Sequence, residues 1–173
     1  MIPDTAAQRM WREASSNEEY KIKRISLKNI DTIYELGKQE FTGQLWYTKK
    51  FLKETLRHPG YHYGAYAGKK LVGYILSKKF DRPKIWIMSL IVDVEFRKQG
   101  IASKLVNKIQ TESVSSSPLE FFIMFVDTEP EMGPFYEKLG FTFRAEINDW
   151  YDINKPGLIY SKIMTRDGDF IIS

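Results

Sequence analysis

The 173-residue sequence contains no cysteine. This absence excludes disulfide frameworks, thiol nucleophiles, Cys-x-x-Cys redox chemistry and cysteine-rich zinc sites, and it favours a cytoplasmic location. Histidine is nearly as scarce, because His58 and His62 are the only two in the chain. Neither stands in a paired-ligand spacing such as His-Glu-x-x-His. The sequence therefore predicts no metal site.

Long apolar runs are also missing. No stretch approaches the roughly 20 consecutive apolar residues that a membrane helix needs, and the first 20 residues carry charges throughout, unlike a secretory signal. The chain contains neither a Gly-x-Ser-x-Gly nucleophile turn nor a Gly-x-x-x-x-Gly-Lys-Ser/Thr phosphate loop. The sequence therefore lacks the main signals of serine hydrolases and of P-loop enzymes. We expect no membrane partner.

Charge of one sign does not dominate. The 26 Lys and Arg residues against 22 Asp and Glu residues leave a net charge of +4. The basic residues are spread along the chain and have acids nearby, which favours a solvated basic surface over a nucleic-acid site. A hydrophobic content of 43% with 28% charged residues excludes disordered and collagen-like classes. The length suits one domain with a real core.

Apolar periodicity divides the chain into a polar N-terminal extension (1–19), one folded domain (20–165) and a C-terminal tail (166–173). Strands are predicted over 20–25, 61–67, 71–79, 84–92, 120–126, 141–147 and 158–165, with helices over 31–40, 46–56, 100–111 and 133–139. This order predicts an α/β fold with a single mixed sheet of about seven strands and flanking helices.

Three details of this fold follow from local patterns. The nearly continuous apolar run 85–92 predicts a central strand covered on both faces. The helix from residue 100 joins two buried strands, which should be parallel through a right-handed crossover. Residues 148–157 are predicted to form a loop between the last two strands.

The turn after the strand 84–92 carries the chemistry. A helix start exposes unpaired N–H groups and the positive end of the helix dipole, so it binds phosphate. Gly100 lets an anion approach the backbone, Ala102 keeps the next position small, and Ser103 adds a hydroxyl. Positive charge should come from Arg97, Lys98, Lys104 and Lys108, which lie within twelve residues and are expected to be opposed by no acid. The segment is interpreted as a pyrophosphate cradle.

The residues Arg97-x-x-Gly100-x-Ala102 resemble the acetyl-CoA signature of the GNAT superfamily of N-acetyltransferases, and the stretch 134–141, Pro-Phe-Tyr-Glu-Lys-Leu-Gly-Phe, resembles a second signature of that family. The resemblance covers residues 20–165. It implies direct transfer of an acetyl group from acetyl-CoA to a primary amine. It also implies that the parallel strands 84–92 and 120–126 splay apart and take pantetheine between them.

The resemblance further assigns residues to roles. Backbone groups of Leu90, Ile91 and Val92 should bind the pantetheine amides. The pyrophosphate should lie at the basic turn and the helix start, on Arg97, Lys98, Gln99, Gly100, Ile101, Ala102 and Ser103. Tyr136 stands where the family usually places the tyrosine acid that protonates the departing thiolate. A core aromatic in an amphipathic helix is the structural alternative for Tyr136.

The general base is less defined. Several relatives use a glutamate within the strand that is wholly apolar here over 122–126, so this chain departs from the family pattern. Asp127 and Glu129 are the nearest carboxylates, and they either act as the base, directly or through water, or cap the next helix. An α-amine of pKa about 7.8 is roughly 14% neutral at pH 7, against about 0.04% for a lysine amine near 10.4. Weak base machinery therefore favours α-amines.

Two stretches should flank the acceptor amine. The first, 39–47, looks like the corresponding stretch of ribosomal-protein alanine acetyltransferases and supplies Phe41 and Trp46, although Thr42 replaces the usual proline. The second, 148–152, supplies Trp150 and Tyr151, the paired aromatics that protein N-terminal acetyltransferases place over a peptide N-terminus. The acids Glu146, Asp149 and Asp152 make its rim negative, unless they are ordinary turn acids.

The resemblance therefore predicts an acetyl-CoA-dependent N-acetyltransferase whose acceptor is a protein or peptide N-terminal amine, acting as a monomer or homodimer. One alternative acceptor is a small amine such as a polyamine, an amino acid or an aminoglycoside. The other alternative is a CoA-binding module without turnover, for which the missing strand glutamate is the main support.

Overall fold

The computed structural model describes residues 20–40, 47–80, 83–115 and 121–165. The predicted N-terminal extension and C-terminal tail lie outside the described residues, as do Phe41 and Trp46. Within the described part, the elements follow one another in the predicted order.

The centre of the molecule is a sheet of seven strands in the order β1-β2-β3-β4-β5-β7-β6. Their bounds are β1 Lys21–Arg24, β2 Tyr63–Ala67, β3 Lys70–Lys79, β4 Lys84–Val92, β5 Phe121–Thr128, β6 Thr142–Asp152 and β7 Lys155–Thr165. Strands β4 and β5 pair in parallel, and all the remaining neighbouring strands pair antiparallel. The predicted mixed seven-stranded sheet with a parallel pair at its centre is confirmed.

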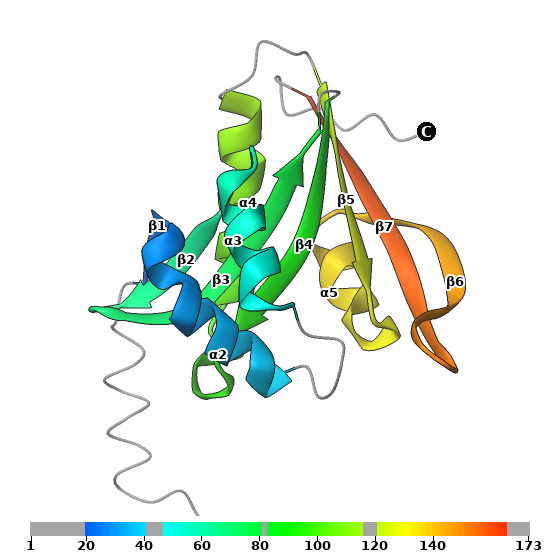
Figure 1. Cartoon of the computed structure of the whole chain (residues 1–173). Coiled ribbons are helices and arrows are strands. Elements are labelled where there is room, and N and C mark those ends of the chain that lie inside the picture. The colour runs from blue at the N-terminus through cyan, green and yellow to red at the C-terminus, as the bar shows by residue number, and fades with distance from the viewer. Residues whose placement is uncertain (1–19, 41–46, 81–82, 116–120, 166–173) are drawn as a thin grey trace, which may run out of the picture.

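Helices α2 (Ile30–Glu40) and α3 (Lys49–Arg57) cover one face of the sheet, while α4 (Ile101–Ser115) and α5 (Gly133–Lys138) cover the other (Figure 1). Helix α3 starts where the Thr48 side chain accepts a hydrogen bond from the Phe51 amide at 3.2 Å, and it ends just before Pro59, which cannot continue a helix. Helix α4 starts directly after Gly100.

Each face of the sheet has its own apolar core. On the α4 side the fully buried helix residues are Ile101, Leu105, Val106 and Ile109, packed with Ile75, Ile85 and Ile87 of the sheet. On the α2–α3 side, Ile33, Leu36 and Leu52 pack with Tyr74 and Leu76. Burying one such side chain stabilises the fold by about 1.5–3 kcal/mol. The core on the α4 side therefore holds the start of α4, through Ile101, against the sheet.

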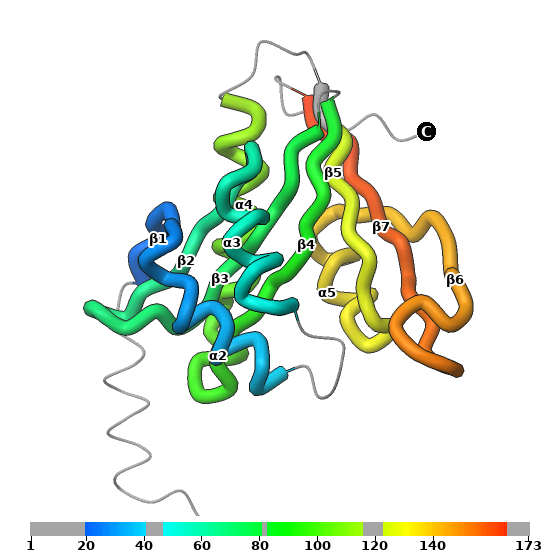
Figure 2. Tube along the Cα trace, viewed as in Figure 1, coloured from blue at the N-terminus to red at the C-terminus, as the bar shows by residue number. Residues whose placement is uncertain are grey.

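The central strands separate along their length. Parallel pairing runs from Lys84 opposite Ile123 to Ile87 opposite Val126 and then stops, although β4 continues to Val92. Beyond that point β5 keeps only its partner β7. The two strands diverge towards the end of β4 that leads to α4 (Figure 2). The predicted splay is confirmed, and it leaves one edge of residues 88–92 facing a gap.

A β-bulge in β4 changes which side chains face each core. Leu76 pairs with Ser89 and Ser77 with Ile87, so Met88 is the extra residue. Ile85 and Ile87 pack on the α4 side, whereas Ile91 packs on the α2–α3 side. The expectation that β4 is covered on both faces is confirmed, since α2 packs on one side of it and α4 on the other. Its burial alternates along the strand, and Trp86, Met88, Leu90 and Val92 are only partly buried.

The last two strands form a longer hairpin than expected. The predicted loop 148–157 was wrong, since β6 continues to Asp152 and β7 begins at Lys155. Ile147 pairs with Gly157 and Asp152 with Lys155, so four residues of β6 stand opposite one of β7. This irregularity hides the strand period in the sequence. Gly157 leaves room for Trp150, because a Cβ at Gly157 would lie 2.4 Å from the indole.

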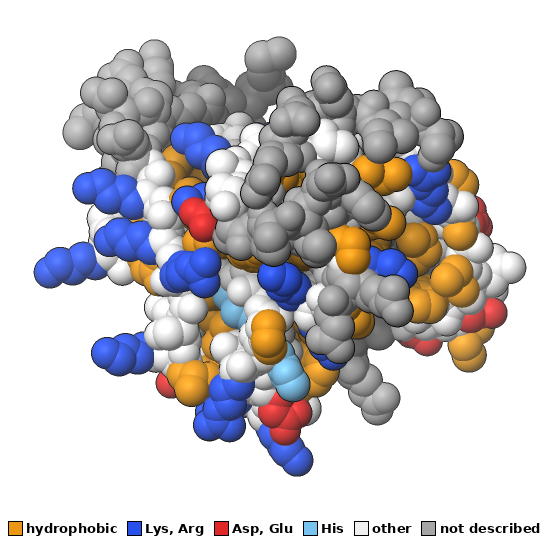
Figure 3. Space-filling view, turned by 90° about the horizontal axis from the view of Figure 1, so that it is seen from above, with side chains coloured by type: hydrophobic (Ala, Val, Ile, Leu, Met, Phe, Trp, Pro, Cys, Tyr) orange, Lys and Arg blue, Asp and Glu red, His pale blue; other side chains and the backbone are white. Residues whose placement is uncertain are grey.

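Seen from above, the molecule shows many Lys and Arg side chains and few acids (Figure 3). Uncharged side chains separate most of these basic groups on this face. The arrangement resembles a solvated basic surface more than a continuous basic patch.

Candidate active site

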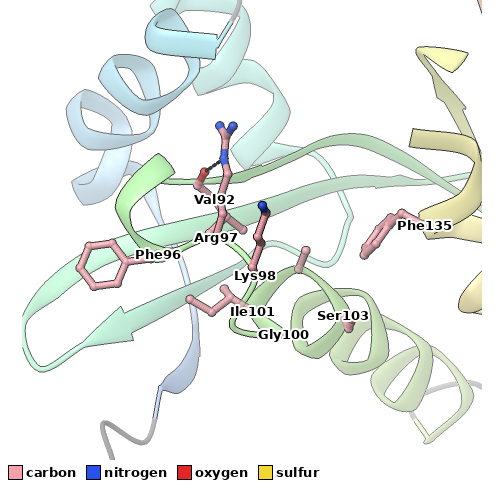
Figure 4. A pocket seen from close by; sticks show the side chains of 9 residues that line it. Val92, Phe96, Arg97, Lys98, Gly100, Ile101, Ser103 and Phe135 are labelled. Carbon is pink, nitrogen blue, oxygen red and sulfur yellow. Dashed lines mark hydrogen bonds between the residues drawn. The ribbon is translucent and has the colours of Figure 1, made fainter. Parts of the chain in front are cut away.

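The start of α4 lines a pocket of about 270 Å³. Its walls come from the end of β4, the basic turn, the first turn of α4 and Phe135 of α5, with Val92, Phe96, Arg97, Lys98, Gly100, Ile101, Ala102 and Ser103 as the other lining residues. In Figure 4 Phe135 lies across the pocket from the basic turn that carries Arg97 and Lys98. Six of the seven residues predicted for the pyrophosphate therefore line one pocket, and Gln99 does not.

The backbone of the turn is shaped to present its amides. Lys98 and Gly100 both have positive φ values, 60° and 77°. A Cβ at Gly100 would meet no atom within 4 Å, so the backbone there borders open space. The first turn of α4 starts with the Lys104 amide bonded to the Gly100 carbonyl at 3.0 Å. The amides before Lys104 remain available to an anion, as at any helix start.

Arg97 is held by the protein itself. Its Nε donates to the Val92 carbonyl at 3.0 Å, and its guanidinium forms an ion pair with Glu40 at the end of α2. The expectation that no acid opposes this cluster was therefore wrong for Arg97. It was also wrong for Lys108, whose ammonium lies 2.6 Å from the Glu112 carboxylate. The charge that the turn offers to an anion is thus reduced.

Gln99 and Lys104 both contact Tyr20, the residue that directly precedes β1. The Tyr20 hydroxyl donates to the Gln99 side-chain oxygen, and the Lys104 ammonium lies 5.8 Å from the centre of the Tyr20 ring. These contacts fix the outer side of the turn. They explain why Gln99, although within the predicted segment, does not line the pocket.

Tyr136 lies on α5, 3% exposed, among Phe135, Phe141 and Tyr160. Burial, together with the nearby charge of Asp127, raises the pKa of the Tyr136 phenol well above its usual value. The hydroxyl is therefore neutral at physiological pH and able to donate a hydrogen bond. The structure shows Tyr136 as a packed core aromatic close to the candidate carboxylate, and its role as the acid stays a prediction.

Asp127 follows the apolar part of β5 and accepts three hydrogen bonds from side chains. Trp86 Nε1 of β4 donates to Oδ1 at 2.7 Å, while Trp150 Nε1 and the Tyr151 hydroxyl of β6 donate to Oδ2 at 3.0 and 3.1 Å. The parallel register places Trp86 beside Phe125, and the two rings stack with centroids 6.3 Å apart. Two of the four predicted acceptor residues thus meet one predicted carboxylate.

Glu129 has a different environment. It occupies the N-terminal cap position of the 3-10 helix Pro130–Met132, yet its side chain makes no capping hydrogen bond. It is exposed, and its charge contributes to the raised pKa of the Tyr151 phenol. Glu129 therefore lies near the acceptor aromatics with an accessible carboxylate.

Two residues in this region escaped prediction from the sequence. Trp86 lies in the middle of an apolar strand, where nothing marks it as different from its neighbours. Tyr47 just precedes α3, and its hydroxyl donates to the Met88 carbonyl at the bulge at 3.2 Å. Burial and the Asp127 charge raise the pKa of Tyr47 to about 12. Only the register of β4 against β5 would have revealed that Trp86 faces Asp127.

Among the described residues, no group of three or more His, Asp and Glu side chains is placed to hold a metal ion. No helix in that part of the chain combines the length and apolar character required to cross a membrane.

Comparison with known proteins identifies the family of this chain. The model of the acetyltransferase (GNAT) family matches residues 27–141. The catalytic subunit NAA20 of the N-terminal acetyltransferase B complex from Arabidopsis thaliana is 26% identical over 150 residues, which cover 83% of this chain and 80% of that protein.

Two solved structures share the fold. The ribosomal-protein-S18-alanine N-acetyltransferase from Escherichia coli superimposes with a TM-score of 0.75 at 12% identity, covering 90% of this chain and all of that one. Arabidopsis thaliana Naa50, in complex with the bisubstrate analogue CoA-Ac-MVNAL, gives a TM-score of 0.70 at 22% identity, covering 83% of this chain and 97% of that one. The family match spans well over half of the chain, and the protein belongs to the GNAT family of acetyltransferases. It is an acyltransferase that uses acetyl-CoA.

Proposed function

We propose that this protein transfers the acetyl group of acetyl-CoA to the N-terminal α-amine of a protein or peptide. The observation that carries the proposal is the set of aromatic side chains around Asp127. Trp150 and Tyr151 extend from the β6–β7 hairpin to a carboxylate on β5, beside the gap between β4 and β5. The 26% identity to the catalytic subunit of an N-terminal acetyltransferase supports the same acceptor class.

The residues of the helix start fit the cosubstrate. The pyrophosphate of acetyl-CoA would lie on the amides of the first turn of α4, next to the open space at Gly100. The unpaired edge of β4 from Leu90 to Val92 would take the pantetheine amides, because β5 has already diverged there. Lys98 and Ser103 line the pocket and add a charge and a hydroxyl to the amides.

The acetyl transfer forms a C–N bond and breaks a C–S bond. The amine must first lose a proton, and the departing thiolate gains one. A thiol has a pKa near 8.5 and a phenol near 10, so complete transfer from the phenol is already uphill. Because burial raises the pKa of Tyr136 further, we assign Tyr136 the role of hydrogen-bond donor that stabilises the thiolate as it forms.

Glu129 is the better placed of the two candidate bases. Its carboxylate is exposed and makes no cap, while both oxygens of Asp127 already accept hydrogen bonds. An exposed carboxylate has little driving force to remove a proton from a lysine amine, whose pKa is about 10.4. Deprotonating an α-amine with a pKa near 7.8 costs over 3 kcal/mol less, at about 1.36 kcal/mol per pKa unit. This difference favours an α-amine acceptor. We place the activity in the cytoplasm, which the lack of cysteine favours.

The proposal is tested by measuring thiol release from acetyl-CoA against matched acceptors. The panel holds peptides with free and with blocked N-termini, lysine peptides blocked at the N-terminus, polyamines and aminoglycosides. Turnover on free N-termini, with less than about a tenth of that rate on the other amines, is the expected result. Faster turnover on a polyamine or an aminoglycoside would replace the proposal with a small-amine acceptor. If acetyl-CoA binds by calorimetry but no amine of the panel reacts, the proposed peptide acceptor is rejected, and either a different acceptor or a CoA-binding module without turnover remains.

A further inference from the structure

Asp127 lies where three strands of the sheet come together around the gap. It sits near the end of β5, its Trp86 partner comes from β4 on one side, and its Trp150 and Tyr151 partners come from β6 beyond β7 on the other. The three donors approach from separate elements, and each bond is 2.7 to 3.1 Å long. A carboxylate with this set of donors connects the parallel centre of the sheet to its outermost strand.

The partner segment of β6 has few backbone restraints of its own. Residues 148–151 have no register partner on β7, because pairing jumps from Ile147 to Asp152. Within this segment Asp149 has a φ of 53°, and Trp150 is 45% exposed. Trp150 also packs against Gly157, and the indole and phenol bonds to Asp127 are what link these two side chains to β5 across the gap.

The same bonds leave little capacity for proton abstraction. An ionised carboxylate offers about four lone-pair sites, and three of them already accept hydrogen bonds from Trp86, Trp150 and Tyr151. Hydrogen bonds to a charged group are about twice as strong as neutral ones. Only one site, on the Oδ1 oxygen that already accepts from Trp86, remains for an amine that would give its proton to Asp127.

We propose that Asp127 is a positioning residue for the acceptor and not the general base: it fixes Trp150 and Tyr151 against Trp86 and so shapes the acceptor side of the cleft before a substrate binds. This inference deepens the proposed function and rests on it for the acceptor class. Trp86 stacks on Phe125 with an angle of 2° between the ring planes, and this stacking fixes the orientation of the indole that donates to Asp127. The acceptor thus meets an already ordered aromatic surface, which lowers the entropy lost on binding.

The first test does not depend on activity. Indole N–H resonances of Trp86 and Trp150 are assigned by NMR with the variants Trp86→Phe and Trp150→Phe. In the protein without substrates, Asp127→Asn is expected to shift both resonances, because one carboxylate oxygen becomes an NH2 donor that cannot accept. Glu131→Gln, which neutralises an exposed acid nearby in the chain, is the matched control and should leave both unchanged. Unshifted indoles in Asp127→Asn would overturn the proposal.

The second test separates positioning from base catalysis. Asp127→Asn and Trp150→Phe should each raise the KM for an accepted peptide by roughly tenfold, the effect of losing one hydrogen bond to a charged group. The double variant should be little worse than either single variant, since both changes break one contact. Acetyl-CoA affinity and the acidic limb of the kcat–pH profile should stay as in the wild type.

A lost acidic limb, with kcat reduced more than a hundredfold and peptide KM unchanged, would identify Asp127 as the base and reject the proposal. Additive effects of the two substitutions would reject it as well. Failure of the proposed acceptor class is distinguishable, because it would show as wild-type inactivity on every peptide while the indole resonances still respond to Asp127→Asn. Tyr151→Phe keeps the ring and removes one donor, so it supports the same comparison if Asp127→Asn does not fold.

Discussion

The Tyr47 hydroxyl donates a hydrogen bond of 3.2 Å to the carbonyl of Met88, the extra residue in the bulge of β4. This contact ties the start of α3 to the point where β4 leaves β5. It also satisfies a backbone oxygen that the bulge removes from the sheet pairing. The bulge is therefore supported by a side chain from outside the sheet.

Tyr47→Phe should destabilise the protein, because the Met88 carbonyl loses its partner at a partly buried position. The expected loss is about 1 kcal/mol, which corresponds to a fall of about 2–4 °C in Tm for a chain of this size. Urea unfolding monitored by circular dichroism measures it. Tyr34→Phe is a suitable control, since it removes a phenol from the same face while leaving the bulge contact intact. Equal midpoints for Tyr47→Phe and the wild type would show that the bulge does not need the contact.

Gly100 allows a prediction with a closely matched control. Gly100 and Gly68 both have positive φ, 77° and 59°, and a Cβ at either would meet no atom within 4 Å. Replacing either glycine with alanine should therefore destabilise the protein by about 1–2 kcal/mol through backbone strain. Only Gly100 borders the pocket at the start of α4, whereas Gly68 lies in the β2–β3 turn.

The two glycine variants separate strain from binding. Gly100→Val should abolish acetyl-CoA binding in calorimetry, because its side chain enters the space next to the helix amides, and Gly100→Ala should weaken it. Gly68→Ala and Gly68→Val should bind acetyl-CoA as the wild type does. Equal affinities across all four variants would place the cosubstrate elsewhere.

Much of the fold could be predicted because its signals are local. Gly100 marks the start of α4, Pro59 follows the end of α3, and the Gly-Lys-Lys sequence at 68–70 marks the turn between β2 and β3. The bulge at Met88 could not be predicted, since one inserted residue in an apolar run leaves no pattern. The extent of β6 was missed for a related reason, because four residues opposite one disrupt the alternation that identifies a strand.

The candidate site likewise has one part that the local sequence predicts and another that only the fold brings together. The pocket residues around Gly100 are consecutive in sequence, so their spacing was informative. Trp86 and Asp127 are 41 residues apart, and Arg97 and Glu40 are 57 apart, so only the folded chain brings them together. The parallel register sets Trp86 opposite Phe125, and Asp127 follows two residues later on the same face. That register depends on the whole sheet and not on any local motif.

Tyr136→Phe tests the assigned donor. The substitution keeps the ring packing with Phe141 and Tyr160 and removes only the hydroxyl. We expect kcat to fall by roughly ten- to a thousandfold with unchanged acetyl-CoA affinity, because the bond forms mainly as the thiolate develops. Steady-state thiol release and calorimetry measure the two quantities. Tyr160→Phe removes a neighbouring phenol that donates to Glu137, and it should leave kcat nearly unchanged. Wild-type turnover in Tyr136→Phe would remove Tyr136 from the mechanism.

His62 predicts how stability depends on pH. Its ring is 8% exposed, and burial lowers its pKa below the usual value near 6.5. The unfolded chain therefore binds a proton at a higher pH than the folded protein does. Stability should be constant for this group above pH 6.5 and should decrease as the pH falls from there towards the lowered folded-state pKa.

The comparison of two histidines isolates this effect. Urea unfolding between pH 7.5 and 5.5 should show a decrease in the free energy of unfolding for the wild type. His58→Gln, which changes the exposed histidine, should retain that decrease. His62→Leu should flatten the profile, whatever its stability at pH 7.5, because the buried titratable group is gone. A decrease that survives in His62→Leu would assign the pH dependence to other groups.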